Sequence, residues 1–355
     1  MKSLVLAVFL ILLIVMSGCC RLLDRSEECG NGLCGAKETC STCQVDCGPC
    51  AHCGDGTCIN ENCSTCSQDC GPCPVENISN LSPGDHDFSF QFGGLTRTYR
   101  VYVPTNPKEN MPLVLVFHGA GMTGEEVEKG TSFNSKANGE GFVVAYLNGK
   151  SCPYNALPNR LGQFWNSGDC TNPCVNADDV GFTRAVIADL KSKTSIDGKR
   201  IYAMGFSNGA MLTQRLACEM STEIAAFVSN SGALSLDYSK CNPSRPISLL
   251  HIHGAADNTV VYLGTSNPQL GGAGCNSGKP IPDAIAFWKE KDGCTGADGV
   301  VYQKGTTTCT KNSNCAGNSE IELCVVQGGG HTIFNTKDIN SVDFAWDFFS
   351  GKSLD

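Results

Sequence analysis

Two adjacent segments near the N-terminus cannot fold around a hydrophobic core, and this constrains the chain more than any other feature. Residues 29–50 and 53–73 are two copies of one pattern, each with six cysteines and almost no apolar side chains. Cross-links must supply their stability, because so few apolar groups are available to bury. We therefore predict a disulfide-rich, coil-dominated repeat module over residues 29–73, distinct from the rest of the chain.

The cysteine count favours disulfides over metal ligands in this module. The chain has 24 cysteines, far more than a reducing cytosol usually tolerates. Residues 29–73 contain twelve of them and residues 152–324 contain ten, and even numbers are expected where cysteines pair. The Cys40-x-x-Cys43 spacing would also suit zinc, and recurring acidic and amide side chains would suit Ca²⁺. We expect no bound metal, and a module that acts as a spacer or a weak binding unit.

The first residues have the pattern of an export signal. One lysine precedes thirteen apolar residues, Leu4–Met16, and Ser-Gly-Cys follows them. These are the charged, apolar and small-residue regions of a signal peptide, and a cysteine directly after Ser-Gly resembles a lipoprotein signal. We predict a signal peptide over residues 1–18, lipidation at Cys19 with anchorage to the cell membrane, and a membrane-proximal tether over residues 19–28. The alternative is an uncleaved signal anchor that extends to Leu23.

Charge and hydropathy argue against two other classes of protein. The formal charge is −9, and residues 1–86 hold ten acidic and four basic side chains, whereas a nucleic-acid-binding protein would present a basic face. Beyond the N-terminal segment, no apolar run reaches the roughly 20 residues that a membrane-spanning helix needs. Residues 74–86 are polar and contain two prolines, which predicts a linker. We expect no nucleic-acid partner.

The pattern changes at about residue 87, where strands and helices begin to alternate. Two antiparallel strands are predicted over residues 88–92 and 96–103, and buried parallel strands over 113–117 and 142–146. Further along, the predicted strands are 201–204, 227–229, 247–252 and 321–326, and the predicted helices are 179–191, 208–220, 281–291 and 341–349. Such alternation produces a doubly wound, mostly parallel sheet covered on both faces. We therefore predict an α/β domain over residues 87–355.

Four suggestive segments lie at the carboxyl ends of predicted strands. They are HGAG at 118–121, GFSNG at 205–209, HIHGAAD at 251–257 and GGGH at 328–331. In an open α/β sheet, functional groups gather at the carboxyl ends of the strands. We therefore expect these four segments to meet at one edge of the sheet.

The segment Gly205-Phe206-Ser207-Asn208-Gly209 links a predicted strand to a predicted helix. A G-x-S-x-G sequence in that position is typical of the nucleophile elbow of α/β-hydrolases. The turn is so sharp that a Cβ two residues from Ser207 would strike neighbouring backbone. The helix N-terminus beneath the hydroxyl favours developing negative charge. We predict that Ser207 is a nucleophile, and the alternative is an ordinary glycine-rich turn.

A serine nucleophile needs a base, and one of the six histidines has the required position in the chain. In α/β-hydrolases the order is serine, then an acid, then histidine. Asp257 and His331 complete this order, with His331 as the base and Asp257 as the residue that orients it. Asp283 is the alternative acid, but its place at a helix start is typical of a cap. His251 and His253 are expected to be packed or hydrogen-bonded beneath the site rather than to bind a metal, because no third ligand has matching spacing.

The oxyanion that forms during acyl transfer needs two backbone N–H donors. We assign one to Asn208, directly after the nucleophile, and the other to Ala120, in the loop after the first buried strand. Gly119 and Gly121 would let this loop approach a substrate carbonyl. His118 is expected to brace the loop rather than serve as a second base.

These motifs together resemble a family of extracellular esterases, the polyhydroxybutyrate depolymerases and the feruloyl or acetylxylan esterases. The resemblance covers residues 90–350, and the matching stretches are HGAGMTG, FWNSGDC, DDVGFTRAVIADL, IYAMGFSNGAML, RLACE, LHIHGAADNTVVY, AFWKEKDGC and EIELCVVQGGGHT. It implies an α/β-hydrolase fold with a triad of Ser207, Asp257 and His331. Thr332-Ile333 stands where the family often has Trp-Pro, so the leaving-group side of the pocket is not predicted.

Several other side chains in the matching stretches have expected roles. Trp165, in FWNSGDC, is expected to line the acyl pocket, and the alternative is a core aromatic. Asp178 and Asp179 are expected to cap the helix that follows them.

The cysteines of the α/β domain are expected to form five disulfides. The resemblance implies Cys218–Cys241. A hairpin that turns near residues 314–318 would face Cys309 to Cys324, and Cys294 then fits Cys315. Two bridges remain unassigned among the last four cysteines, which are Cys152, Cys170, Cys174 and Cys275.

The pattern as a whole predicts an exported serine carboxylesterase, secreted or anchored at the cell surface. Its expected substrate is a feruloyl or acetyl ester of a plant polysaccharide, a polyhydroxyalkanoate, or a small aryl or alkyl ester, and no cofactor is implied. The same elbow serves peptidases, so a serine peptidase is the first alternative. A non-catalytic surface binding protein that retains the fold is the second.

Overall fold

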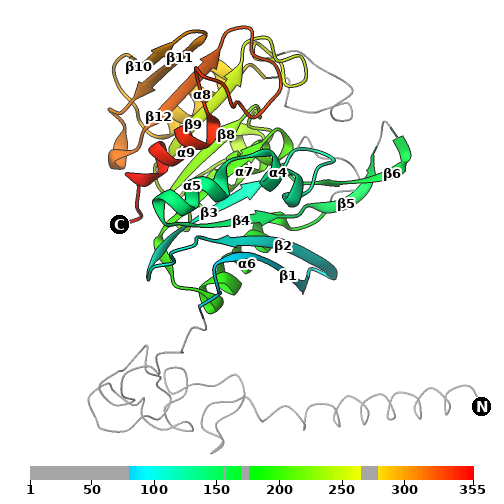
Figure 1. Ribbon diagram of the computed structural model, residues 1–355. Coiled ribbons are helices and arrows are strands. Elements are labelled where there is room, and N and C mark those ends of the chain that lie inside the picture. Colours follow the sequence, from blue (N-terminus) through cyan, green and yellow to red (C-terminus); the bar gives the residue numbers. More distant parts are fainter. Residues whose placement is uncertain (1–79, 155–156, 169–175, 265–278) are drawn as a thin grey trace, which may run out of the picture. The chain divides into compact units, whose positions relative to one another are not determined.

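A ten-stranded sheet organises the part of the chain that the computed structural model describes, which is residues 80–154, 157–168, 176–264 and 279–355. Its strands are β1 (Gly84–Phe92), β2 (Leu95–Val103), β3 (Met111–Phe117), β4 (Val143–Leu147), β7 (Ile196–Phe206), β8 (Ala226–Asn230), β9 (Ser248–Gly254), β10 (Gly299–Lys304), β11 (Thr307–Asn312) and β12 (Ile321–Val326). They lie in the order β1-β2-β4-β3-β7-β8-β9-β12-β11-β10 (Figure 1). A separate hairpin consists of β5 (Lys150–Tyr154) and β6 (Leu157–Phe164).

The middle of the sheet is parallel and its edges are antiparallel. Strands β4, β3, β7, β8, β9 and β12 run parallel to one another, whereas the β1–β2 and β10–β11 hairpins extend the sheet at opposite edges. Every residue of β3, β4, β8 and β9 is buried, as expected of strands covered on both faces. The parallel strands therefore bring their carboxyl ends to one rim, where a site can form.

Helices cover both faces of this sheet and create a separate core on each side. The helices are α4 (Gly124–Gly130), α5 (Phe133–Glu140), α6 (Asp179–Lys193), α7 (Asn208–Glu219), α8 (Ile281–Lys291) and α9 (Ser341–Ser350). Alternate residues of β3 divide between the cores, with Leu113, Leu115 and Phe117 toward α6, α7 and α8, and Val114 and Val116 toward α4, α5 and α9. Among the described residues, no helix is both long and apolar enough to cross a membrane.

The structure contains every strand and helix predicted for the α/β domain, and it adds some that were not predicted. Helices α4 and α5 and the β5–β6 hairpin were missed because their sequences carry few apolar residues; α4, for example, buries Val127 as its single large apolar side chain. Strand β1 begins at Gly84, inside the segment predicted as a linker. Leu81 also packs against the core and donates its backbone N–H to Lys193. The folded domain therefore begins before residue 87.

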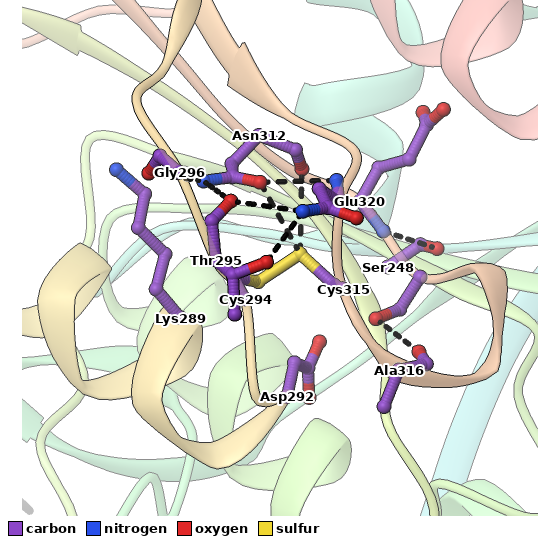
Figure 2. The surroundings of a disulfide bond; sticks show 12 residues. Ser248, Lys289, Asp292, Cys294, Thr295, Gly296, Asn312, Cys315, Ala316 and Glu320 are labelled. Carbon is purple, nitrogen blue, oxygen red and sulfur yellow. Dashed lines mark hydrogen bonds between the residues drawn. A yellow bond between two sulfur atoms is a disulfide. The ribbon is translucent and has the colours of Figure 1, made fainter.

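Three disulfides in the described residues have the expected pairing. Cys218 bonds to Cys241, Cys294 to Cys315, and Cys309 to Cys324. Cys309 and Cys324 are register partners on β11 and β12. Figure 2 shows the Cys294–Cys315 bond, beside which the Asn312 amide donates to the backbone oxygens of Thr295 and Gly296. This disulfide fastens the end of α8 to the β11–β12 hairpin.

Other sequence-based predictions fall outside the described residues. They are the signal peptide over 1–18, the lipidation at Cys19, the tether over 19–28, the repeats over 29–73, and Cys170, Cys174 and Cys275. These remain predictions.

Candidate active site

Ser207 occupies a strained turn between β7 and α7. Its φ of 54° and ψ of −119° lie in a region that side-chain-bearing residues rarely adopt. A Cβ at Gly205 would lie 2.2 Å from the backbone oxygen of Gly209, and a Cβ at Gly209 would lie 2.3 Å from that of Phe117. Both glycines are therefore required by close backbone approach. This is the geometry of a nucleophile elbow, which holds the hydroxyl at the rim of the sheet.

The structure brings Ser207, His331 and Asp257 together from three strand ends. Nε2 of His331 lies 2.9 Å from Oγ of Ser207, and Nδ1 lies 2.7 Å from Oδ2 of Asp257. The Asp257 side chain is fully buried, whereas the His331 side chain is 17% exposed. A carboxylate accepts hydrogen bonds, so Nδ1 carries the proton and Nε2 offers its lone pair to the serine hydroxyl.

Asp257 is held as an ionised acceptor. Its Oδ1 accepts hydrogen bonds from the backbone N–H groups of Thr259 and Val260, at 2.8 and 2.9 Å. Burial alone would raise the pKa of Asp257, but its hydrogen bond to His331, the His331 charge and the two backbone donors outweigh burial and lower that pKa. A carboxylate fixed at both oxygens can orient the imidazole and stabilise its protonated form. Asp283, the alternative acid, lies in the first turn of α8.

The loop that carries His331 is fastened by residues that the sequence analysis did not single out. Nδ2 of Asn230, at the end of β8, donates to the backbone oxygen of Thr332 at 2.7 Å, and the Ser231 hydroxyl donates to the same oxygen. The Ser341 hydroxyl in turn donates to Oδ1 of Asn230. The polar Ser-Asn-Ser run at the carboxyl end of β8, the strand beside β7, was the signal that could have identified them.

His118 braces the loop after β3, as expected. Its side chain is fully buried, Nδ1 donates to the backbone oxygen of Gly119 at 2.8 Å, and Nε2 accepts from the N–H of Gly149 at 3.0 Å. Burial lowers the pKa of His118 to about 4, so the ring is neutral near pH 7. Because Gly119 also accepts from the N–H of Met122, two donors fix its carbonyl.

That fixed carbonyl sets the direction of the Ala120 N–H. In a trans peptide the C=O and the following N–H point in opposite directions, and the described residues contain no cis peptide. The N–H of Ala120 therefore points away from His118, and no acceptor for it occurs in the described part of the chain. Gly119 is buried, and the N–H of Gly121 is already bonded to the backbone oxygen of Gln163. Of these three residues, Ala120 has the N–H left for a ligand.

Asn208 combines a predicted backbone donor with a clamp made by its side chain. It is the first residue of α7, so its N–H has no acceptor within the helix. Its side-chain Oδ1 accepts from the N–H of Trp165 at 2.8 Å, and Nδ2 donates to the Trp165 carbonyl and the Ser167 hydroxyl. The side chain thereby ties the elbow to residues 165–167.

The prediction that Trp165 lines the acyl pocket is wrong, and the core alternative holds. The residue has no exposed surface. Its indole packs edge-on against Phe117, and Nε1 donates to the backbone oxygen of His118 at 2.9 Å. Because its backbone also bonds to Asn208, Trp165 connects the two segments that carry the predicted oxyanion donors.

The two aspartates before α6 have different roles. Asp178 is the N-cap and accepts from the N–H of Gly181, as predicted. Asp179 instead forms a buried ion pair with Nη2 of Arg97 at 2.6 Å and accepts from the N–H of Asn166 at 2.7 Å. Burial raises the pKa of Asp179 against the opposing effect of Arg97. The Arg97–Asp179 ion pair thus holds the backbone of Asn166. It thereby supports the neighbouring Trp165, to which the Asn208 side chain is bonded.

The described residues offer no convincing metal site. The group with suitable spacing is Cys309, Glu322 and Cys324, but its two sulfurs are bonded to each other. His251 and His253 lie behind Asp257 on β9, fully buried and bonded to each other.

Comparisons with known proteins find a family model and several relatives that match this chain. The family model described as Esterase PHB depolymerase matches residues 97–241. Feruloyl esterase B of Piromyces equi is 33% identical over 251 residues, which cover 68% of this chain and 42% of that protein. "Putative esterase NocK" of Nocardia uniformis subsp. tsuyamanensis is 32% identical over 255 residues, which cover 67% of this chain and 71% of that one. The chain thus spans less than half the length of the first relative.

A solved structure supports the fold. An acetyl xylan esterase from Aspergillus awamori superimposes with a TM-score of 0.53 at 18% identity, over 75% of this chain and 99% of that one. At this identity the likeness speaks for the fold alone. Together with the mostly parallel sheet and the elbow at its rim, it shows an α/β-hydrolase.

Proposed function

Because the chain belongs to the Esterase PHB depolymerase family, we propose that it is a serine carboxylesterase in which Ser207 and His331 react and Asp257 orients the histidine. One observation carries this proposal: an unbroken path of hydrogen bonds runs from the Ser207 hydroxyl through both ring nitrogens of His331 to the Asp257 carboxylate. Such a path activates an otherwise weak nucleophile. The proposed chemistry uses no cofactor.

Acylation begins at the 2.9 Å contact between Ser207 and His331. Oγ of Ser207 attacks the ester carbonyl carbon while its proton passes to Nε2 of His331. When the tetrahedral intermediate collapses, the bond from the carbonyl carbon to the alcohol oxygen breaks, and the departing alcohol takes the proton from Nε2. The acyl group remains as an ester on Ser207.

Two backbone donors stabilise the oxyanion in this proposal. The Asn208 N–H lies at the positive end of the α7 dipole, and the Ala120 N–H is aimed by the carbonyl that His118 holds. Donors that are already oriented need no reorganisation as charge develops, and one such donor is worth roughly 10²- to 10³-fold in kcat.

Water then completes the cycle. His331 accepts a proton from a water molecule, whose oxygen attacks the carbonyl carbon of the acyl-enzyme. The bond to Oγ of Ser207 breaks, and the serine regains its proton from Nε2. The products are a carboxylic acid and the free enzyme.

We propose that the natural substrate is an ester linked to a polymer, either a feruloyl or acetyl group on a polysaccharide or a polyhydroxyalkanoate. The matched relative from Piromyces equi is named a feruloyl esterase, and the family model is named for depolymerases. Export through residues 1–18 and a lipid anchor at Cys19 belong to the same proposal, since a polymer cannot enter the cell.

A substrate panel tests this function. Purified protein is assayed on methyl ferulate, acetylated xylan and polyhydroxybutyrate film, and on an ester and an amide with the same acyl group. We expect turnover of at least one of the three, faster hydrolysis of the ester than of the amide, and loss of both in Ser207→Ala. Faster amide turnover would favour a peptidase. Absence of hydrolysis of any ester would favour a binding protein.

A further inference from the structure

Two buried histidines stand behind Asp257 and have no part in the reaction proposed above. His251 and His253 alternate on β9, and both are fully buried. Nε2 of His251 lies 3.0 Å from Nδ1 of His253, and Nε2 of His253 lies 2.8 Å from the backbone oxygen of Val260. The same Nε2 is 3.4 Å from Oδ2 of Asp257. Polar side chains are rarely buried this completely without a structural or functional role.

The hydrogen bonds define the tautomer of each ring. A carbonyl oxygen can only accept, so Nε2 of His253 carries its proton and directs it toward Val260 and Asp257. Nδ1 of a neutral His253 must then accept, and the proton between the rings belongs to Nε2 of His251. Nδ1 of His251 is left as an acceptor without a partner among the described residues. Donors therefore point in one direction, from His251 through His253 to the Asp257 loop.

Both groups of Val260 belong to this arrangement. Its carbonyl accepts from His253 at 2.8 Å, and its N–H donates to Oδ1 of Asp257 at 2.9 Å. His253 therefore holds the carbonyl of Val260, and the N–H of the same residue holds the Asp257 carboxylate. It also presents an N–H edge to Oδ2, the oxygen that His331 uses.

We propose that His253 is a positioning residue that holds the Asp257 carboxylate for His331, and that His251, by donating to Nδ1 of His253, supports the tautomer that the Val260 carbonyl selects. The inference rests on the proposed function, because orienting Asp257 matters when His331 acts as a base. It assigns a specific role to two side chains that the sequence predicted to be packed or hydrogen-bonded beneath the site.

Burial keeps both rings neutral, as this role requires. Burial lowers the pKa of each ring, and the neighbouring histidine lowers that of His251 further. The titratable groups facing His253 in the described residues are His251 on its own strand, Asp257 and Tyr262 on the loop that follows, and His331 on the loop after β12. Asp257 is the group among them that would favour a charged His253, and burial outweighs it.

The test compares two substitutions of His253 by the pH dependence of kcat/KM on a small aryl ester. His253→Phe keeps the ring volume and removes the donor, whereas His253→Gln keeps an N–H near the position of Nε2. We expect His253→Phe to lower kcat/KM roughly 10- to 100-fold, as when a supporting partner of a functional side chain is lost. The acidic limb, which reports protonation of the base, should move to higher pH by about half a unit, because a carboxylate without this donor holds the imidazolium more strongly.

His253→Gln should recover most of the loss and return the limb toward its original position. Ile252→Val is the matched control, since Ile252 lies on the same strand in the opposite core, and it should lower stability without moving the limb. Equal losses in the Phe and Gln variants, or a limb that stays in place or moves to lower pH in His253→Phe, would overturn the proposal.

A measurement that needs no activity separates this proposal from the esterase itself. ¹⁵N imidazole spectra of the full chain at neutral pH should show His251 and His253 protonated at Nε2 alone. In His251→Phe, the proton of His253 should stay on Nε2, which faces Val260, while the ¹⁵N shift of its Nδ1 should change because the donor from His251 is lost. A proton on Nδ1 of His253 in the wild-type protein would contradict the inference even in a fully active enzyme. Correct tautomers in a protein without ester turnover would instead overturn the proposed function.

Discussion

The loops after β3 and β12 each carry a histidine at the same rim, and the two differ in every physical respect that matters. His331 is partly exposed and is bonded to two side chains, Ser207 and Asp257. His118 is fully buried and is bonded to two backbone groups, of Gly119 and Gly149. In the proposed mechanism the His331 ring exchanges a proton with the substrate, whereas the His118 ring holds a loop. Both histidines lie beside glycines in the sequence, so the sequence context does not distinguish them. Their hydrogen-bond partners and their exposure to solvent do.

The largest expected loss of activity comes from removing the hydrogen bond between His331 and the Asp257 carboxylate. Asp257→Asn should lower kcat by about 10⁴-fold, because an amide cannot hold the tautomer or stabilise the imidazolium. Folding should be unchanged, since the amide oxygen can still accept from Thr259 and Val260. Steady-state kinetics on an aryl ester, with circular dichroism as the control, check this. Activity near that of the wild type would assign the orienting role to another residue.

The next largest loss of activity comes from removing the hydrogen bond between His118 and the backbone oxygen of Gly119. His118→Leu removes the donor to Gly119 and frees the Ala120 peptide to rotate, so kcat should fall by about 10²-fold, as when one oxyanion donor is lost. His118→Asn keeps a donor at that position and should recover part of the rate. His86→Ala, at an exposed histidine bonded to Ser82, should change nothing. If His118→Leu kept the wild-type kcat, the bracing role would be wrong.

A smaller loss is expected when the clamp between the two oxyanion donors is weakened. Asn208→Ala keeps the backbone N–H but loses the hydrogen bonds to Trp165 and Ser167. We expect kcat to fall by roughly tenfold, which is less than for the loss of a donor, because the N–H remains and is only misplaced. KM should change little. A variant that lost all activity while remaining folded would show that the side chain does more than clamp.

The last prediction concerns protein stability and tests whether the folded protein holds His118 neutral. Burial lowers the pKa of His118 from 6.5 to about 4, so the folded state binds fewer protons than the unfolded state between these values. Its contribution is therefore fully present above pH 6.5 and is lost as pH falls through 4, on the order of 3 kcal/mol. The free energy of unfolding, from denaturant titrations at pH 7 and pH 4, should fall less in His118→Asn than in the wild type. An identical fall would contradict a neutral, buried His118.

The order of residues along the chain predicted which groups meet, but not how each is supported. Ser207, Asp257 and His331 were found because parallel strands bring their carboxyl ends to one rim. Asp179 was assigned to a helix cap because it starts a helix. Its ion-pair partner, Arg97, is 82 residues away in the chain, and no local pattern joins the two.

The directions in which side chains point were also not predictable from the sequence. Nothing in FWNSGDC indicates that the Trp165 indole turns inward to the His118 carbonyl, or that Asn230 reaches Thr332 across the site. Such contacts depend on how loops pack after the strands are in place. The sequence therefore predicts the groups that we propose to react better than the residues that hold them.

Fluorophosphonate labelling followed by peptide mass mapping tests the central claim most directly, because the probe reacts only with a serine that a neighbouring base activates. The account predicts one adduct, on Ser207, in the wild-type protein, and none in Ser207→Ala or His331→Ala. An unlabelled wild-type protein, or an adduct on another residue that persists in Ser207→Ala, would contradict it.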